Sequence, residues 1–290
     1  MRFNSDQIQK IGKEISSKVD GKTLFDEFSR GRYSTDASVY QIKPLGVVLP
    51  KDTNDVLSLM EYSQKNSVPL LARGGGSSQC GQTVGESVVL DYSKHQNKIL
   101  ELNVEEKYVW VQPGVVLDHL NAYLKPHGLW FPVDVSTSSR ATIGGMSANN
   151  SCGSRSLYYG NMVHNVLAIE AILDDGSIFN FDQINKNYLA TKNNQDRLYK
   201  IIDKFIDVRQ QVGGEIDANW PTTQRRVGGY NIDLIDPEGF NSSNLLVGSE
   251  GTLSLFNKIK LKLSEIPKNK ILGVCYFDNF HQAMELSKEI

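Results

Sequence analysis

A run of three glycines and two serines, Gly74–Ser78, holds the residue types that most directly suggest chemistry. Because glycine lacks a Cβ, consecutive backbone N–H groups can turn toward one point and form a nest for a phosphate. Ser77 and Ser78 add hydroxyl donors. The run directly follows the apolar residues 68–72, which predict a strand. The segment predicts a phosphate-binding turn, although a glycine-rich surface turn would have the same local composition.

Two common nucleotide-binding motifs do not fit this turn. Residues 76–83 (GSSQCGQT) depart from the P-loop pattern because Gln82 stands where the phosphate-binding lysine belongs. The dinucleotide motif GxGxxG fails because Gln79 occupies the third glycine position. Both motifs continue into a helix, whereas residues 87–91 (SVVLD) predict another strand. Any phosphate bound here is therefore expected to lie in a different architecture.

Two more clusters of small and hydroxyl-bearing residues follow along the chain. The first lies within residues 130–159 and includes STSS at 136–139 and TIGG at 142–145. The second, residues 248–253 (GSEGTL), interrupts a strand pattern with two glycines and an acid. Such segments bury little apolar surface for their length, so packing alone explains them poorly. The three clusters together predict one extended polar ligand that is contacted from three directions.

The elements between these clusters predict a mixed fold. Apolar residues at steps of three and four predict helices, and short apolar or alternating runs predict strands. Residues 32–41 predict an ordered loop. Predicted helices cover 6–19, 23–29, 55–65, 116–124, 198–212 and 280–290, and predicted strands cover 45–49, 68–72, 87–91, 99–103, 108–112, 166–173, 177–181, 245–247, 255–263 and 271–277. Residues 174–176 (DDG) predict a hairpin with a type I′ turn.

The composition fits a folded protein, with 40% hydrophobic and 22% charged residues. A net charge of −2 disfavours nucleic acid or an anionic membrane as a partner. The three cysteines, Cys80, Cys152 and Cys275, are far apart and match no metal-ligand spacing, which predicts reduced thiols. The polar N-terminus lacks the apolar core of a signal peptide, and no apolar run is long enough to span a membrane. These features predict a cytoplasmic protein.

Seven segments around the clusters form a recognisable series: RYSTDASVY (32–40), PLGVVLPKDTNDV (44–56), RGGGSS (73–78), VDVSTSSRATIGGM (133–146), YYGNMVHNV (158–166), GGYNIDLI (228–235) and VGSEGTL (247–253). In this order they resemble the FAD-binding domain of the vanillyl-alcohol oxidase type (PCMH-type). The most similar branch is that of the D-lactate, glycolate and D-2-hydroxyglutarate dehydrogenases. The resemblance runs from about Arg30 to Leu263, and it is too ordered to be a chance match.

The resemblance implies an α+β fold with two FAD-binding subdomains and the start of a cap domain. Residues 1–39 would form an N-terminal helical segment and loop. Residues 40–267 would form the FAD-binding domain, with subdomains of about 40–100 and 101–267. Residues 268–290 would begin a substrate-binding cap domain that is truncated here.

The resemblance also implies which residues bind FAD. Residues 74–79 would wrap the pyrophosphate, the second cluster would line the pyrophosphate and the isoalloxazine, and the third would close over the flavin. The predicted cofactor-binding residues are Arg73, Gly74, Gly75, Gly76, Ser77, Ser78, Gln79, Pro132, Asp134, Thr137, Ser138, Thr142, Gly144, Gly145, Gly153, Tyr159, Gly160, Glu250, Gly251 and Thr252.

Two departures from the family pattern concern the flavin link. Members with covalently bound flavin carry a histidine in the first loop, or a cysteine ahead of the TxGG element. In this chain those positions hold Ser77 and Ser138. The resemblance therefore implies non-covalent FAD.

The implied reaction is oxidation of a D-2-hydroxy acid, such as D-lactate, glycolate or D-2-hydroxyglutarate, to the 2-keto acid. Electrons would pass on to a quinone, a cytochrome, an electron-transfer flavoprotein or an iron–sulfur partner. No catalytic base or metal site is assigned, because in the family these lie in the cap. His127 and His164 are interpreted as structural, Cys152 as a small buried thiol, and Arg225, Arg226 and Tyr230 as either substrate-facing or solvated. Two alternatives stay open: an FAD-dependent sugar or lactone oxidase, and a flavin-binding subunit or fragment without turnover of its own.

Overall fold

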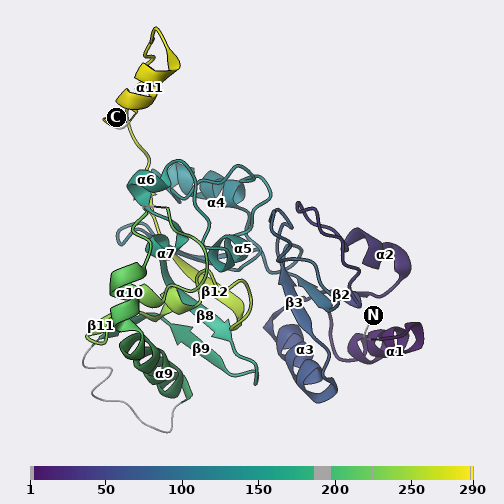
Figure 1. The fold of residues 1–290 in the computed structure, drawn as a ribbon. Coiled ribbons are helices and arrows are strands. Elements are labelled where there is room, and N and C mark those ends of the chain that lie inside the picture. The colour runs from purple at the N-terminus through teal and green to yellow at the C-terminus, as the bar shows by residue number, and fades with distance from the viewer. Residues whose placement is uncertain (1–2, 186–196, 224, 288, 290) are drawn as a thin grey trace.

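Two β-sheets lie side by side and carry the fold (Figure 1). The computed structural model describes residues 3–185, 197–223, 225–287 and 289. The first sheet has the strand order β1-β2-β4-β3, and the second has the order β5-β6-β12-β8-β9. Two small pairs, β10-β11 and β13-β7, are separate from them.

The first sheet is mainly parallel and contains β1 (Lys22–Leu24), β2 (Gly46–Leu49), β3 (Leu70–Arg73) and β4 (Val88–Asp91). The central strand β4 is buried along its whole length, and β2 and β3 both pair with it in parallel. This explains why β2 and β4 read as continuous apolar runs rather than alternating ones. The short β1 pairs antiparallel with β2 at the edge.

Three helices accompany this sheet: α1 (Ser5–Ser16), α2 (Glu27–Arg32) and α3 (Thr53–Asn66). Helix α1 buries Ile8, Ile11 and Ile15, whose spacing places them on one face. Helix α3 begins after Asp52, whose carboxylate accepts hydrogen bonds from the backbone N–H groups of Asn54 and Asp55.

The second sheet is antiparallel and contains β5 (Ile99–Asn103), β6 (Tyr108–Val111), β8 (Val166–Ile172), β9 (Ile178–Phe181) and β12 (Leu255–Lys262). Strand β12 is central and pairs with both β6 and β8. Its Ile259 and Leu261 are buried, whereas the lysines between and after them are not. This alternation is the pattern expected of a strand with one face on the core.

Helices α4 (Leu117–Leu124), α5 (Ile143–Ala148) and α9 (Arg197–Gln211) contribute to the core of the second sheet. The remaining elements are α6 (Ser156–Tyr159), α7 (Met162–Asn165), α10 (Gly213–Asn219), α11 (Phe280–Leu286), β7 (Leu129–Trp130), β10 (Gln183–Asn185), β11 (Gly239–Asn241), β13 (Ser264–Glu265), and the 3₁₀ turns η1 (Lys125–His127), η2 (Ile232–Leu234) and η3 (Ser242–Leu245).

The two halves share part of their packing. Ile172 at the end of β8 and Leu255 at the start of β12 belong to the core of the first sheet. Thr53 also donates a hydrogen bond to Asn257 at 2.8 Å, and Gln64 donates one to the Asp174 carbonyl at 2.5 Å. The second sheet is therefore anchored in the core of the first.

Most predicted elements are confirmed, and three are wrong. Residues 23–29 divide between β1 and α2, because Thr23 pairs with Val48 on β2. Leu245 ends a 3₁₀ turn, and residues 246–247 continue as a turn instead of forming a strand. Residues 271–277 form no strand. The end of the predicted helix 280–290 includes residues 288 and 290, which lie outside the described residues.

The hairpin between β8 and β9 is confirmed, but its predicted turn type is wrong. A type I′ turn needs positive φ at both central residues. Here Gly176 has φ +79°, whereas Asp174 and Asp175 do not have positive φ. The Leu173 N–H donates to the Ser177 carbonyl, and the Gly176 N–H to the Leu173 carbonyl. This is the three-residue loop in which a left-handed glycine follows an ordinary turn.

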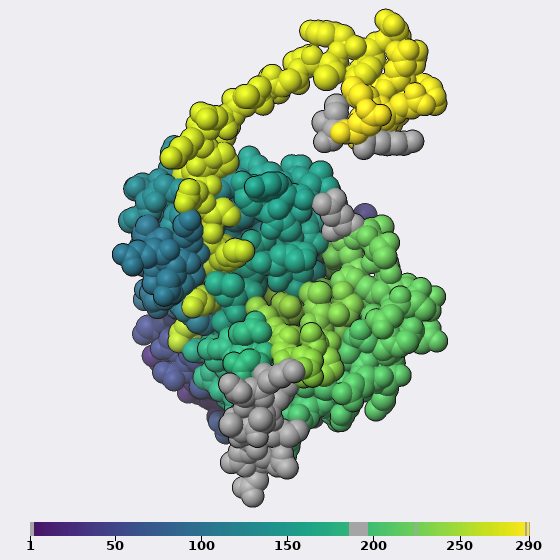
Figure 2. All heavy atoms as spheres, turned by 90° about the vertical axis from the view of Figure 1, so that its left-hand side faces the viewer, coloured from purple at the N-terminus to yellow at the C-terminus, as the bar shows by residue number. Residues whose placement is uncertain are grey.

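The segment after Pro267 extends away from the body of the molecule (Figure 2). Its apolar residues are exposed, with Ile271 at 96% and Tyr276 at 91%. The domain boundaries predicted at residues 39, 100 and 267 stay predictions. Among the described residues, no helix has the length and apolar character to cross a membrane.

Candidate functional site

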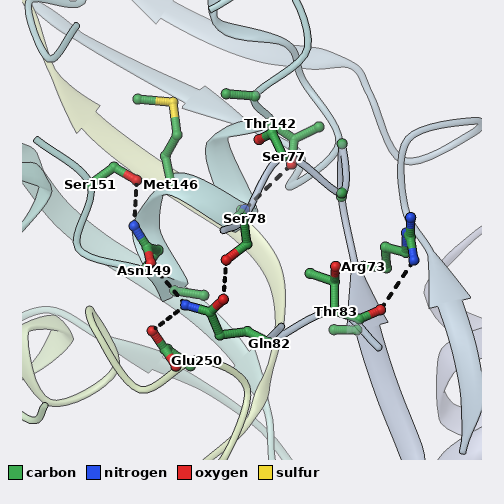
Figure 3. Close-up of a pocket in the computed structure, with 18 of the residues that line it drawn as sticks. Arg73, Ser77, Ser78, Gln82, Thr83, Thr142, Met146, Asn149, Ser151 and Glu250 are labelled. Atoms are coloured by element: carbon green, nitrogen blue, oxygen red, sulfur yellow. Dashed lines mark hydrogen bonds between the residues drawn. The ribbon is translucent and has the colours of Figure 1, made fainter. Parts of the chain in front are cut away.

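The three clusters meet at one cavity of about 450 Å³ between the two halves of the fold (Figure 3). Strand β3 ends at the glycine turn, helix α5 carries the second cluster, and the third cluster lies just before β12. The predicted residues that line it are Arg73, Gly74, Gly75, Gly76, Ser77, Ser78, Gln79, Thr137, Thr142, Gly144, Gly145, Glu250 and Gly251. The expectation that one extended site is contacted from three directions matches this geometry.

The glycine turn presents free donors to the cavity wall. Within the described residues, no hydrogen-bond acceptor faces the backbone N–H groups of residues 74–79. Gly76 has φ +63°, whereas Gly75 does not have positive φ. A Cβ at Gly75 would instead overlap the Arg140 carbonyl. The positive φ of Gly76 and the close packing at Gly75 thus require glycine at both positions of the turn.

Arg73 uses its guanidinium to position this turn. It donates to the carbonyls of Tyr33 at 3.3 Å, Thr35 at 2.8 Å and Thr83 at 3.2 Å. Burial lowers the pKa of Arg73 from its ordinary value, and nearby Asp91 and Asp36 oppose that shift. Because its donors point at carbonyls, its predicted direct contact with a cofactor stays a prediction.

The loop 33–41 packs against the same turn from outside. Tyr33 donates to Asp91 at 2.6 Å, and burial with this bond raises the pKa of Tyr33. Thr83 donates to Asp36 at 2.9 Å, and the Ala37 N–H donates to the Gly76 carbonyl at 3.1 Å. These contacts fit the ordered loop that the sequence predicts for residues 32–41.

Helix α5 forms the opposite wall, and its presence in the small-residue stretch 141–150 was not predicted. Thr142 caps it by accepting from the Gly145 N–H. A Cβ at Gly144 would lie 2.5 Å from the Pro113 Cβ. A Cβ at Gly145 would meet only the Thr142 Oγ1, in a tight contact of 3.3 Å that a small shift of this hydroxyl relieves, and Gly145 lines the cavity.

The third cluster is tied to the end of α5 through its backbone. The Gly248 N–H donates to the Ser147 carbonyl at 3.0 Å, and the Glu250 N–H to the Ala148 carbonyl at 2.9 Å. Glu250 has φ +51°, a left-handed conformation that non-glycine residues seldom adopt. These bonds hold the Glu250 carboxylate beside the cavity.

Gln82 connects the walls, although sequence reasoning did not place it in the site. Its carboxamide nitrogen donates to Glu250 at 2.9 Å and to Asn149 at 3.3 Å, and its oxygen accepts from Ser78 (Figure 3). The only sequence signal was its place in the rejected P-loop pattern. Ser136, in the segment predicted to line the cofactor, also lines the cavity. Lining residues outside the predicted set include Tyr92, Met146, Asn149, Ser151, Cys152 and Ser254.

Seven predicted site residues do not line this cavity: Pro132, Asp134, Ser138, Gly153, Tyr159, Gly160 and Thr252. Asp134 accepts from the Arg155 N–H at 3.0 Å and from Ser154 at 2.9 Å, so it orders the turn after Gly153. Tyr159 packs edge-on against Trp130 in a separate hollow. Their contact with a cofactor stays a prediction.

The groups considered for substrate chemistry lie mostly outside the cavity. His164 Nδ1 accepts from the Asn161 N–H at 3.0 Å, which fits the structural role predicted for it. Arg226 forms an ion pair with Asp233 at 2.5 Å. Cys152, expected to be buried, is half-buried and lines the cavity, and Arg225 donates to its sulfur at 3.2 Å.

A second carboxylate is missing from the cavity wall. Glu250 is the one carboxylate among the described lining residues, and no histidine or lysine joins it there. No group of three or more metal-ligating side chains occurs in the part of the chain that the structure describes.

The cavity fits the cofactor that the resemblance implies. FAD contains a diphosphate, and the unpaired N–H groups of residues 74–79 are donors of the kind that bind phosphate. Six of the lining residues are glycines, so backbone can approach a long ligand closely. The buried hydroxyls of Tyr92 and Ser254, both on lining residues, also lack a partner among the described residues.

Comparison with known proteins points the same way. Residues 44–182 match the model of a family described as FAD binding domain. The chain is 34% identical to the D-2-hydroxyglutarate dehydrogenase of Haemophilus influenzae over 87% of its length and 25% of that protein. It is 30% identical to the glycolate oxidase subunit GlcD of Bacillus subtilis over 98% of its length and 51% of that protein. The chain thus spans between a quarter and about half the length of these relatives.

Solved structures show the same fold. An alkyldihydroxyacetonephosphate synthase superposes with a TM-score of 0.63 at 18% identity, over 90% of this chain and 44% of that one. The two-subdomain α+β fold predicted from the sequence is therefore confirmed. The chain thus contains a segment that matches an FAD binding domain, and along most of its length it is similar to relatives named D-2-hydroxyglutarate dehydrogenase and glycolate oxidase subunit.

Proposed function

We propose that this chain forms the FAD-binding part of an oxidoreductase that converts a D-2-hydroxy acid to its 2-keto acid. The observation that carries the proposal is the cavity between the three clusters, with its row of unpaired N–H groups on residues 74–79. The relatives named for D-2-hydroxyglutarate, glycolate and D-lactate support this substrate class. D-2-hydroxyglutarate is the first substrate to test, because its dehydrogenases share 33–35% identity with the chain.

The proposal gives each wall of the cavity a task. The N–H groups of residues 74–79 hold the diphosphate, and Arg73 keeps their loop in place. Thr137 and Gly145 line the path of the cofactor, and Glu250 covers it from the third cluster. When bound, FAD supplies the two-electron acceptor for the oxidation. The protein positions the cofactor and excludes water from it.

The proposal includes a non-covalent cofactor, because Ser77 and Ser138 are not residues that commonly attach flavin. We expect purified protein to be yellow and acid precipitation to release all flavin as free FAD into the supernatant. Absorption spectra of supernatant and pellet provide the measurement. Flavin that stays with the precipitated polypeptide would contradict the prediction, and a colourless protein that takes up no added FAD would contradict the proposed function.

For the electron acceptor, the proposal names only a type of partner, and for the location in the cell it names only a compartment. A quinone, a cytochrome, an electron-transfer flavoprotein or an iron–sulfur partner would each accept electrons from reduced flavin. A cytoplasmic location is our inference from the sparse, unpaired cysteines, all of which are free in the structure. Some relatives are named as mitochondrial, among them one from Danio rerio.

One observation favours a second possibility, a flavin-binding part without turnover of its own. Glu250 is the one carboxylate among the described lining residues, and it is hydrogen-bonded to Gln82. Oxidation of a 2-hydroxy acid needs a base that accepts the hydroxyl proton, and a positioned base typically contributes about 10²–10⁴-fold in rate. Turnover by the isolated chain separates the two possibilities.

A further inference from the structure

We propose that Ser78, Gln82, Asn149 and Glu250 form a clasp across the FAD cavity, and that opening of this clasp limits how fast FAD enters and leaves. The inference rests on the proposed function, because it takes non-covalent FAD as the occupant of the cavity. The inference concerns the rates at which FAD binds and dissociates, and not the Kd of FAD.

The clasp is centred on one carboxamide. Gln82 Nε2 donates to the Glu250 carboxylate at 2.9 Å and to Asn149 Oδ1 at 3.3 Å, while Gln82 Oε1 accepts from the Ser78 hydroxyl (Figure 3). All four residues line the cavity. The bond to Glu250 involves an ionised acceptor, which makes it the strongest of the set.

The two ends of the clasp belong to different halves of the fold. Ser78 and Gln82 lie on the loop between β3 and β4 of the first sheet. Asn149 ends α5, where its N–H donates to the Gly145 carbonyl at 3.0 Å, and its side chain donates to Ser151 at 3.1 Å. Glu250 is fixed by its N–H bond to the Ala148 carbonyl. The acceptors are therefore held by the second half, and the clasp joins the halves across the cavity.

Because all four clasp residues line the cavity, the proposal takes FAD to pass between these same loops. While the clasp is closed, the loops cannot separate without breaking the Gln82 bonds. Gln82 is partly exposed and Glu250 is exposed, so water can replace these bonds when the clasp opens. If FAD passes only when the clasp is open, closing it slows entry and departure by the same factor.

The test compares Gln82→Ala with the unaltered chain. Stopped-flow flavin fluorescence gives the association rate, and displacement of bound FAD by an excess apoprotein of another flavoprotein gives the dissociation rate. We expect both rates to rise about tenfold, the factor that matches the loss of one charge-assisted hydrogen bond. The Kd of FAD should change less than about threefold, because the two rates rise together.

Gln64→Ala is the matched control. Gln64 is another glutamine of the first half, and it donates to the Asp174 carbonyl of the second half at 2.5 Å, away from the cavity. Its loss should leave both rates unchanged. Glu250→Ala removes the Gln82–Glu250 bond from the other end and leaves the Gln82–Asn149 bond, so it should raise both rates by no more than Gln82→Ala does. Because Gln82→Ala already removes every bond of the clasp, the double variant should exchange FAD no faster than Gln82→Ala alone.

Three outcomes would overturn the clasp. If Gln82→Ala raises only the dissociation rate and weakens the Kd in proportion, Gln82 is a direct ligand of FAD. If neither rate changes, opening does not limit exchange. If Gln64→Ala accelerates exchange equally, any loosening between the halves has the effect. A different result would contradict the proposed function itself: the unaltered chain would bind no FAD.

Discussion

Neighbouring glycines of the cavity wall have different physical tasks. Position 144 requires glycine because a Cβ there would lie 2.5 Å from the Pro113 Cβ. Position 75 requires glycine because a Cβ there would overlap the Arg140 carbonyl. Substituting either residue would therefore move backbone. A side chain at Gly145 would enter the cavity, and its Cβ would require only a small shift of the Thr142 hydroxyl. A substitution at Gly145 can therefore test FAD binding without a large loss of stability.

We expect Gly145→Leu to weaken FAD binding at least tenfold while the apoprotein keeps its melting temperature within about 2 °C. The leucine enters the cavity, and leucine has a higher helix propensity than glycine by roughly 0.8 kcal/mol, so α5 is not weakened. FAD titration followed by flavin fluorescence provides the Kd.

Gly214→Leu on α10 is the control for this substitution, because a Cβ there has open space and the position lies outside the cavity. It should leave the Kd unchanged. Full FAD affinity in Gly145→Leu would show that this wall of the cavity is not the cofactor site.

The residues of the site were predictable where their type itself carries a physical signal. The Gly74–Ser78 turn, Thr142 and Glu250 stood out by composition, and all of them line the cavity. Gln82 did not, because a glutamine in a loop has no signal until its partners from Asn149 and Glu250 are in place. Tyr92 was missed because it directly follows strand β4, and its position in the sequence predicts only a buried core residue.

At the scale of elements, the short helix α7 shows how a single side chain can set a helix start. Asn161 caps it, and His164 Nδ1 accepts a hydrogen bond from the Asn161 N–H. The bond requires a neutral ring. Partial burial, and then the Arg226 guanidinium, lower the pKa of His164 below its ordinary value, which favours that form.

This arrangement predicts a pH dependence of stability. Because the pKa of His164 is lowered in the folded state, the unfolded chain takes up the proton first as the pH falls below about 6.5. The free energy of unfolding should therefore decrease from pH 7.5 to pH 5.5. In His164→Gln, whose amide oxygen can accept the same bond at every pH, the decrease should be smaller by up to about 1 kcal/mol, the value of one cap.

Urea unfolding at the two pH values, on both chains, measures the difference. Other groups titrate in both chains alike, so the comparison isolates His164. Parallel curves for the two chains would contradict the prediction.

Elements that depend on distant partners were the ones that sequence patterns predicted poorly. Leu272, Val274 and Tyr276 alternate as in a strand, yet residues 271–277 have no neighbouring strand to pair with among the described residues. Leu245 to Val247 are all buried, and a short apolar run of this kind cannot distinguish a strand from a helical turn. By contrast, α1 and β12 carry clear periodicities and were predicted correctly.

At the scale of the molecule, the two halves build the cavity that we propose for FAD, and Glu250 is the one carboxylate among its described lining residues. Tyr230 contacts Thr252 at 2.8 Å, and neither of them lines the cavity. The described residues thus form the cavity proposed for the flavin, but they do not place a clear proton acceptor beside it.

We expect the 290-residue chain, loaded with FAD, to be reduced readily by dithionite but only slowly by D-2-hydroxyglutarate. Its flavin should bleach about 10²–10⁴-fold more slowly than that of the Haemophilus influenzae relative, because a positioned base contributes a factor of this size. Anaerobic absorption spectra of both proteins, with D-lactate and glycolate as further substrates, provide the measurement. Comparable bleaching in both proteins would place the base within this chain, and Tyr230→Phe and His164→Gln would then identify it.

The sharing of Ile172 and Leu255 with the first core has a consequence for synthesis on the ribosome. The last strand of the first sheet, β4, ends at Asp91, but Leu255 emerges much later. At about 5–20 residues per second, on the order of 10–30 s pass between them. During that time the nascent first half exposes the apolar surface that these two side chains later cover. This interval is the period in which chaperones that bind apolar segments have their best access to the growing chain.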